Sequence, residues 1–183
     1  SVPLHKSDHD YRDHAARQSQ AYGIAFWIPF HGAPVCRIDR VDPYAVRSAV
    51  GTMLGLGYDV RSDDLDYPLL RKLALEWKDN AEYYFGDYYP LTSYTVDQGS
   101  WLAWQYHRTE QNDGLIQVFR RAASPYVTAR FKLRGLEPGA TYVLTDVDRG
   151  EIARKSGEDL ATSGLILTIE EQPSAVTIRY RTH

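Results

Sequence analysis

The stretch from Trp101 to Arg121, WLAWQYHRTEQNDGLIQVFRR, decides the fold class of the second half of this chain. Two short, apolar-rich segments, WLAWQYHR and GLIQVFRR, meet at the turn signal QNDG (111–114). A cluster of Asn, Asp and Gly between two strand-like segments is typical of a β-hairpin. We therefore predict two neighbouring antiparallel strands here.

The sequence after Asp97 continues in the same style. Four further segments have alternating or continuously apolar character, and turn residues such as Glu137–Gly139 separate them: TARFKLRGL, TYVLTDVD, GLILTIEE and AVTIRYRT. Short strands at a spacing of roughly ten residues are typical of an antiparallel β-sandwich. We predict such a sandwich over residues 97–183, with the domain boundary between Tyr94 and Ser100.

The first 96 residues have a different pattern. Residues 13–22 are polar with small residues and stop at Gly23, as a helix does. The run IAFWIPF (24–30) is short and wholly apolar, which favours a strand buried on both faces. Residues 44–60 begin like a helix and end like a second buried strand. Alternating helices and buried strands predict an α/β unit with a parallel sheet over residues 1–96.

The clearest helix lies in SDDLDYPLLRKLALEWKDNAEYYFGD (62–87). Its apolar side chains recur every four residues and form one stripe, namely Leu65, Leu69, Leu73 and Trp77. Ser62 and several acids lie at its start, Pro68 suits a first turn, and Gly86 is a natural stop. We expect this helix to bury one face against the rest of the first unit.

Composition excludes several classes of partner. The 183 residues are 43% hydrophobic and 25% charged with a net charge of −3, and no basic run occurs, so we expect no nucleic-acid binding. No apolar run is long enough for a membrane span. Cys36 is the single cysteine, which excludes an intrachain disulfide and a cysteine-based zinc site. One cysteine is compatible with the cytoplasm and no signal peptide is visible, so the localisation stays open.

The segment HKSDHDYRDH (5–14) carries three histidines and three aspartates. It suits a metal site, a catalytic carboxylate in a loop, or a solvated surface segment. His5, His9 and His14 have spacings of four and five, which can place histidines on one helical face, as in zinc sites. The Ser-Asp pair within the segment is typical of a loop, however, and no H-E-x-x-H pattern is present. We therefore expect no metal site.

Three motifs resemble the α-galactosidases of glycoside hydrolase family thirty-six. First, Ser7-Asp8 is followed by Asp13, Arg17 and Tyr22-Gly23, in the order and with the later spacings of that family. Second, LALEWKDNAEYYFGDYYPL (73–91) is similar to the end of the family's last barrel helix. Third, FKLRGLEPGATYVLTDVD with SGEDLATSGL resembles its β-domain.

The resemblance implies a fold and an activity. Residues 1–96 are expected to be the C-terminal part of a (β/α)8 barrel, and residues 97–183 the β-sandwich that follows it. The implied reaction is the retaining hydrolysis of a terminal α-galactoside, which needs a carbohydrate substrate and no metal or organic cofactor. A barrel needs about 250 residues, so the strand with the family's nucleophilic Asp, in a Lys-x-Asp setting, is expected upstream of Ser1. The similar EWKDN (76–80) is rejected because it lies in the amphipathic helix.

The resemblance makes Asp8 the acid/base candidate and leaves Asp13 as a second catalytic candidate. A helix N-cap is the favoured role for Asp13. Arg17, His31 and Trp27 are candidates for substrate binding; core packing is favoured for Trp27 and a turn position for His31. Two departures from the family, namely two extra residues before Asp13 and Ala21 in place of Gln, affect the alignment of these candidates.

A rival hypothesis is a non-catalytic β-sandwich module that binds glycan or a partner protein. It requires exposed, aligned aromatic side chains on the sandwich. Trp101 and Trp104 are three residues apart, so they cannot both face one side of a regular strand. We expect one of them in the core and the other either packed on the barrel portion or bound to glycan, with packing favoured. The fragment hypothesis predicts an inactive isolated chain, because one carboxylate cannot carry out double displacement. A partial barrel also exposes strand edges and apolar surface, which favours a homo-oligomer.

Overall fold

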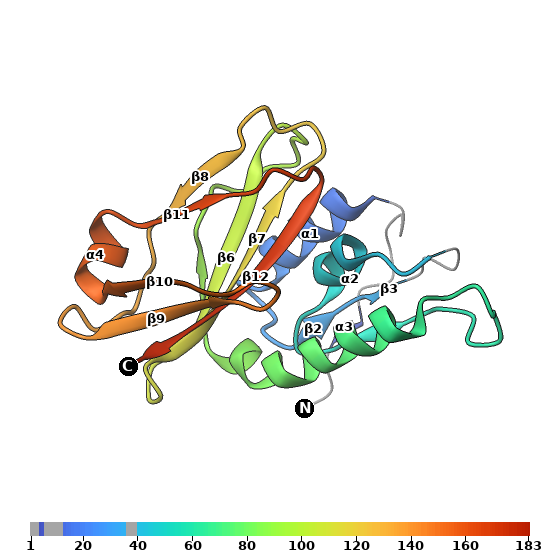
Figure 1. Cartoon of the computed structure of the whole chain (residues 1–183), viewed down its shortest axis with the longest axis horizontal. Helices are drawn as coiled ribbons and strands as arrows, with labels where there is room; N and C mark the ends of the chain where they lie inside the picture. The colour runs from blue at the N-terminus through green and yellow to red at the C-terminus, as the bar shows by residue number, and fades with distance from the viewer. Residues whose placement is uncertain (1–3, 6–12, 36–39) are drawn as a thin grey trace. The chain divides into compact units, whose positions relative to one another are not determined.

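The computed structural model describes residues 4–5, 13–35 and 40–183 of the chain. They form two compact units, residues 1–85 and 86–183, which we describe separately. The division falls after Phe85 because the following strand, β5 (Asp87–Pro90), already hydrogen-bonds with β6 (Trp101–Arg108) of the second unit. Figure 1 shows the elements of both units.

Three α-helices and four two-residue strands make up the described part of the first unit: β1 (Leu4–His5), α1 (His14–Ile24), β2 (His31–Gly32), β3 (Pro34–Val35), α2 (Pro43–Ala49), β4 (Gly55–Leu56) and α3 (Tyr67–Asn80). Strand β1 pairs with β2 and strand β3 pairs with β4, and both pairs are parallel. A 3₁₀ turn, η1 (Ala81–Phe85), follows α3. Parallel pairs alternating with helices agree with the α/β pattern predicted for this part of the sequence.

Helix α1 begins where the sequence predicted and ends later. Asp13 is its N-cap, and its Oδ1 accepts a hydrogen bond from the backbone N–H of Ala16 at 2.9 Å. The helix continues through Gly23 to Ile24 and is followed by a turn in which Trp27 N donates to Ile24 O at 2.9 Å. The prediction of a buried strand over residues 24–30 is therefore wrong.

The exposed aromatic side chains of this turn show why the strand prediction failed. Phe26 and Trp27 are exposed, Trp27 by 85%, so the expectation of core packing for Trp27 is wrong as well. A continuous apolar run shows no helical or strand periodicity. The same residues are therefore compatible with a buried strand or with an exposed turn after a helix. Here Tyr22 on the helix and Phe26 in the turn pack edge to face, with ring centroids 5.9 Å apart.

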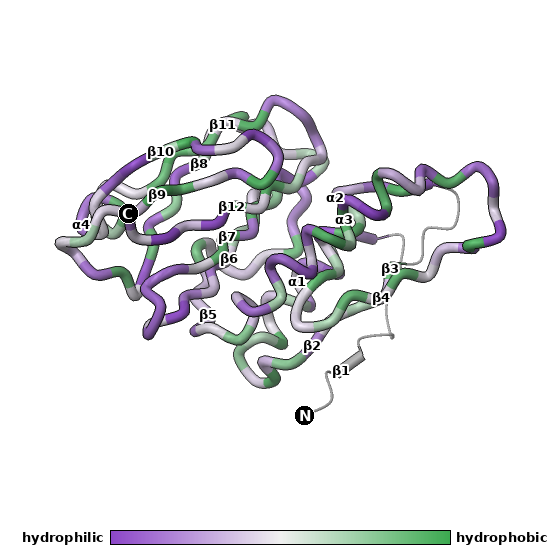
Figure 2. Tube along the Cα trace, turned by 60° about the horizontal axis from the view of Figure 1, so that its bottom comes forward, coloured by the Kyte–Doolittle hydropathy of each residue, from purple (hydrophilic) through white to green (hydrophobic). Residues whose placement is uncertain are grey.

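Helix α3 confirms the predicted amphipathic helix. Asp66 is its N-cap and accepts a hydrogen bond from Leu69 N at 2.9 Å, while Pro68 lies in the first turn as expected. The alternation of hydrophilic and hydrophobic residues along α3 is visible in Figure 2. Leu73 is buried, and the Trp77 indole N–H donates to Gly51 O at 3.0 Å, which ties this face of α3 to the segment after α2.

A buried ion pair joins α2 to α3. The Arg47 guanidinium donates to both carboxylate oxygens of Glu76, from Nε to Oε1 at 2.9 Å and from Nη2 to Oε2 at 2.7 Å. Both side chains are almost fully buried. Two parallel N–H···O bonds fix the orientation as well as the distance of the two groups, so this pair sets how the two helices pack.

The second unit is a two-layered antiparallel structure. One layer is a six-stranded sheet in the order β10-β9-β12-β7-β6-β5, and the other is the pair β11-β8. The strands not yet introduced are β7 (Asp113–Arg120), β8 (Thr128–Phe131), β9 (Thr141–Asp146), β10 (Gly150–Ser156), β11 (Leu165–Thr168) and β12 (Ser174–Thr182). A short helix, α4 (Gly157–Thr162), precedes β11. The antiparallel architecture predicted for this half is thus confirmed.

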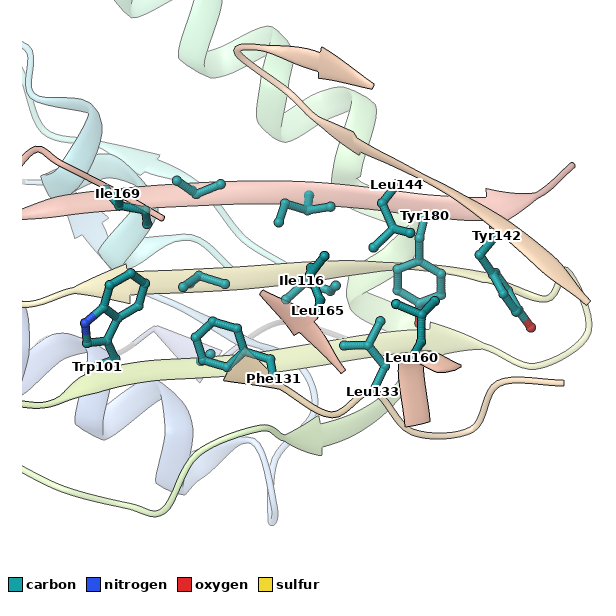
Figure 3. Close-up of a cluster of buried hydrophobic side chains, with 14 residues drawn as sticks. Trp101, Ile116, Phe131, Leu133, Tyr142, Leu144, Leu160, Leu165, Ile169 and Tyr180 are labelled. Carbon is teal, nitrogen blue, oxygen red and sulfur yellow. The ribbon is translucent and has the colours of Figure 1, made fainter. Parts of the chain in front are cut away.

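The core of the second unit lies between the two layers. Figure 3 shows its side chains: Phe131 and Leu165 come from the smaller layer, and Ile116 and Tyr180 from the six-stranded sheet. All four are nearly inaccessible to solvent. The strand β6 places Trp101 in this core and Trp104 on the opposite face of the sheet, where its ring packs against Phe119 at 5.0 Å. The two tryptophans lie on opposite faces, as the three-residue spacing predicted, and both are buried.

A buried polar network crosses one end of the six-stranded sheet. The side-chain amide Nε2 of Gln105 donates to Tyr180 OH at 2.7 Å and to Arg134 O at 2.8 Å. The Nδ1 atom of His107 lies 3.0 Å from Tyr180 OH, and the two rings stack. Burial lowers the pKa of His107, although Asp87 and Asp113 oppose the shift. Burial therefore favours the neutral imidazole.

The lowered pKa of His107 predicts a loss of stability in mild acid. The unfolded chain binds the proton at the ordinary histidine pKa of about 6.5, whereas the folded chain binds it only at lower pH. Stability should therefore decline as the pH falls below that value, until the lowered folded pKa is passed. We expect His107→Asn to flatten this decline relative to the wild-type chain. Urea unfolding between pH 7.5 and 4.5 measures the difference, and parallel curves for the two proteins would contradict it.

Candidate functional site

The residues selected from the sequence lie on the first unit, around α1. Asp8 is outside the described residues, in the connection that leads from β1 to α1. Asp13 caps the N-terminus of α1 with Oδ1, the favoured role in the sequence analysis. As a second catalytic carboxylate it remains a prediction.

Arg17 lies one turn further along α1 and is buried. Its Nη1 donates a hydrogen bond to the backbone carbonyl of Pro34, at the start of β3. The guanidinium thus ties the first half of α1 to the strand that follows β2. A buried arginine bound to a backbone carbonyl restricts how α1 packs against β3.

His31 lies in β2 rather than in the expected turn and is only 2% exposed. Its carbonyl oxygen accepts a hydrogen bond from Thr52 Oγ1 at 3.2 Å. A Cβ atom at Gly51 would overlap with the same carbonyl, so this position requires glycine for close backbone approach. The backbone of His31 thereby anchors the segment after α2 next to β2.

Helix α1 keeps two groups of candidates apart. Asp8 and Asp13 precede or begin the helix, whereas Trp27 follows its C-terminus. Eleven residues lie in α1, which at 1.5 Å per residue makes it about 16 Å long. A single sugar ring cannot reach across that distance. The structure therefore groups Asp13 with Arg17 and places the exposed Trp27 at the other end of the helix.

A buried polar contact that no local sequence pattern reveals packs α1 on α2. Gln18 Nε2 donates to Ser48 Oγ at 2.9 Å, and Ser48 Oγ donates to Tyr44 O at 2.7 Å. All three residues are buried. The polar character of Gln18 on a helix with few apolar residues was the available signal, but its partner is thirty positions away and no local pattern identifies it.

The histidines considered as metal ligands have different settings. The ring of His14 packs edge-on against Tyr44, with centroids 5.6 Å apart. His9 lies outside the described residues, and nothing is described of the His5 side chain. Over residues 13–35 and 40–183, the side chains form no group of three or more that is suited to holding a metal ion. Among the helices described, none combines the length and apolar character that crossing a membrane requires.

Comparison with known proteins identifies a family likeness for the second unit. Residues 101–179 match a family model described as the glycosyl hydrolase family 36 C-terminal domain. The second unit resembles the C-terminal domain of family 36 α-galactosidases. The match covers β6 to β12, the strands that form most of the six-stranded sheet and all of the smaller layer. Curated proteins provide no significant match.

Solved structures share the fold over nearly the whole chain. The galactosidase domain of an α-galactosidase–sucrose kinase, AgaSK, is 23% identical with a TM-score of 0.71. The family 36 α-galactosidase AgaB from Geobacillus stearothermophilus is 20% identical with a TM-score of 0.75. A variant of AgaA from the same organism, solved with raffinose, is 19% identical with a TM-score of 0.73. Each match covers 93% of this chain but only 24–25% of the other.

Proposed function

We propose that this chain is the C-terminal portion, or a short relative, of a retaining α-galactosidase-type glycoside hydrolase. The carrying observation is that 93% of the chain matches part of α-galactosidase structures. The second unit begins at Gly86 and cannot account for that share alone, so the likeness extends into the first unit. In this proposal, residues 1–96 are the last part of the catalytic barrel, and residues 97–183 are the β-sandwich domain that follows it in the sequence.

The parallel strand pairs of the first unit support the barrel assignment. Strands β1 and β2 are connected through α1, and strands β3 and β4 through α2, so each pair with its helix forms a β–α–β unit. This unit is the repeating element of a (β/α)8 barrel. The exposed turn at Phe26–Ile28 follows the C-terminus of α1, away from the face where barrel enzymes build their active sites.

In the proposed mechanism Asp8 is the acid/base. It donates a proton to the leaving glycosidic oxygen and then removes a proton from the attacking water. Retention requires a second carboxylate, which attacks the anomeric carbon from the opposite side. The two carboxyl groups are about 5–5.5 Å apart in retaining enzymes. We assign that nucleophile to a segment outside this chain. Asp13 is held as a helix cap in the described structure, which leaves Asp8 as the better candidate for protonating the substrate.

The positions of the other candidates define their proposed roles. Arg17 and His31 are buried, so we propose that they position the loop that carries Asp8 rather than hold the sugar directly. Trp27 is well exposed, but α1 separates it from the Asp8 end. We therefore do not assign substrate stacking to Trp27. Trp101 and Trp104 are both buried, so a glycan-binding module would have to use other aromatic side chains, such as the exposed Tyr126.

A galactoside titration followed residue by residue tests this proposal. The isolated chain should not hydrolyse an aryl α-galactoside above the rate in buffer, because it lacks the second carboxylate. Binding of 1-deoxygalactonojirimycin, a ligand of AgaA in a solved structure, should shift backbone amide signals at the start of α1. The shifts should disappear in Asp8→Asn and persist in Asp10→Asn, which makes the same chemical change two residues away.

Two results would contradict the proposal. Turnover that is lost in Asp8→Asn would show a complete enzyme rather than a portion of one. Ligand-induced shifts confined to the second unit, and unchanged in Asp8→Asn, would instead support the rival hypothesis of a glycan-binding sandwich.

A further inference from the structure

The two layers of the second unit are unequal, and the smaller one leaves a groove. Six strands form one layer and only β8 and β11 form the other. Strand β10 is the last strand of the six-stranded sheet, and the far edge of β11 has no strand beside it. A cavity of about 340 Å³ lies between these two edges. It occupies the place where a third strand would extend the smaller layer.

Most of the residues that line this groove are aliphatic. Residues 165–169 form one wall, Ile152 and Ala153 of β10 form the other, and Val176 of β12 also contributes. The described lining includes no aromatic ring. A sugar bound by stacking needs such a ring, so the groove suits aliphatic side chains better than a glycan.

Three charged side chains line the groove, namely Asp146, Arg149 and Lys155. Lys155 Nζ already donates to Asp159 Oδ2 at 2.8 Å, so Asp146 and Arg149 provide the hydrogen-bonding capacity considered below. Asp146, only 4% exposed, accepts a hydrogen bond at Oδ1 from Asp148 N at 2.8 Å. Its Oδ2 lies 3.9 Å from Arg149 Nε, and Arg149 Nη2 lies 3.7 Å from Glu171. Both separations exceed hydrogen-bonding distance. Within the described part of the chain, the Arg149 guanidinium makes ion pairs but no side-chain hydrogen bond.

A carboxylate beside a guanidinium with free donors is complementary to a peptide unit. The peptide N–H carries the positive end of its dipole and can donate to Asp146, while the C=O can accept from Arg149. An isolated anion would be repelled by Asp146, and an isolated cation by Arg149. This charge pattern favours a neutral main chain with both a donor and an acceptor.

The two strand edges differ in how they are protected against pairing. Strand β10 has a register shift between Glu151 and Ala153, and it carries Arg154 and Lys155. Bulges and charges of this kind discourage the addition of another strand. Strand β11, with the sequence LILT, has no charge, proline or register shift, and Ile166 is 55% exposed. The edge of β11 is therefore the one that is open to pairing.

Arg120 holds the open edge in place. Its Nη1 donates to the carbonyls of Ile169 and Glu170 at 3.0 and 2.7 Å, and its Nη2 donates to Ser124 O at 3.2 Å. These contacts fix the chain directly after β11. When a strand edge is already rigid, pairing it with another strand has a smaller free-energy cost, because little conformational entropy remains to be lost.

We propose that the groove between β10 and β11 binds an extended segment of another polypeptide, which adds a strand to β11. The segment inserts aliphatic side chains at alternate positions between the two layers, and one of its peptide units bonds to Asp146 and Arg149. Strand addition of this kind obtains its affinity from main-chain hydrogen bonds and its specificity from side-chain pockets.

A peptide titration observed by amide chemical shifts tests the proposal. The probe is the blocked peptide Lys-Thr-Val-Thr-Val-Thr-Lys, and the expected shifts fall in residues 150–156 and 165–169. Arg149→Gln should weaken binding about tenfold, the usual effect of losing one charge-assisted hydrogen bond. Arg154→Gln is the matched control, because Arg154 is exposed to a similar extent, pairs with Glu151 and does not line the groove. Its affinity should equal that of the wild-type chain.

Several outcomes would overturn this inference. A probe with proline at every Val and Thr position has no main-chain N–H between its two lysines to donate to β11, and equal binding of that probe would indicate apolar capture without strand pairing. Equal affinity of Arg149→Gln and the wild-type chain would show that Asp146 and Arg149 do not bind a peptide unit of the segment. Shifts of the same amides with protein concentration alone would identify a second copy as the occupant. Shifts with raffinose would identify a glycan site.

Discussion

Replacing Glu76 by alanine is expected to lower the free energy of unfolding of the first unit by about 3–5 kcal/mol. The Arg47 guanidinium makes two hydrogen bonds to this carboxylate and is almost fully buried. Without Glu76 it becomes an uncompensated charge in a poorly solvated environment, and that loss is larger than the net value of the pair itself. Urea unfolding followed by tryptophan fluorescence measures the effect, since Trp77 is on the same helix.

The double substitution Arg47→Met with Glu76→Leu provides the matched control. It removes both charges together and leaves apolar side chains of similar length, so it should cost far less than Glu76→Ala alone. Glu110→Ala, at an exposed position after β6, should leave stability unchanged within about 0.5 kcal/mol. A double variant as unstable as the single one would show that the charges do not act as a pair.

The second large effect is expected for Gly114→Ala. Gly114 is paired with His107 of β6 and with Tyr180 of β12. A Cβ atom at this position would overlap with the carbonyl of Tyr106 and with the phenol of Tyr180. The carbonyl belongs to a central strand and cannot move without breaking the sheet. We expect a loss of about 3 kcal/mol or more, at the upper end of overpacking effects.

Two further variants distinguish this clash from a general effect of removing glycine. Gly139→Ala adds the same methyl group where no atom lies within 4 Å, so it should be neutral or slightly stabilising. Adding Tyr180→Phe to Gly114→Ala removes the hydroxyl but leaves the ring carbon Cζ, which would lie 2.4 Å from the added Cβ, so the double variant should recover none of the loss. Thermal unfolding by circular dichroism ranks the three proteins. Equal stability of Gly114→Ala and Gly139→Ala would show that the strands do not approach as closely as described.

Local sequence predicted the elements whose determinants are themselves local. The period-2 segments around QNDG (111–114) form the β6–β7 hairpin, and the three-residue spacing of Trp101 and Trp104 places them on opposite faces. Asp66 and the apolar stripe before Gly86 determine α3. In each case a propensity or a period acts over a few neighbouring residues, so no distant partner is needed to recognise the element.

Two strands of the second unit were not predicted from the sequence because their identity depends on their neighbours. Strand β10, GEIARKS, is charged and largely exposed, and only its pairing with β9 makes it a strand. Strand β5, DYYP, is short and follows the turn η1, and its partner is β6. An edge strand buries little surface, so its sequence carries little apolar periodicity.

The candidate site divides in the same way. The sequence by itself determined that Asp13 begins a helix, because an N-cap is recognised by the residues next to it. Only the tertiary structure decided that Arg17 reaches Pro34, that His31 is buried in a strand and that Trp27 faces solvent. It also decided that β10 and β11 enclose a groove. The physical reason is that these features depend on which distant segments pack together. A hydrophobic run favours burial but does not determine the segment against which it packs.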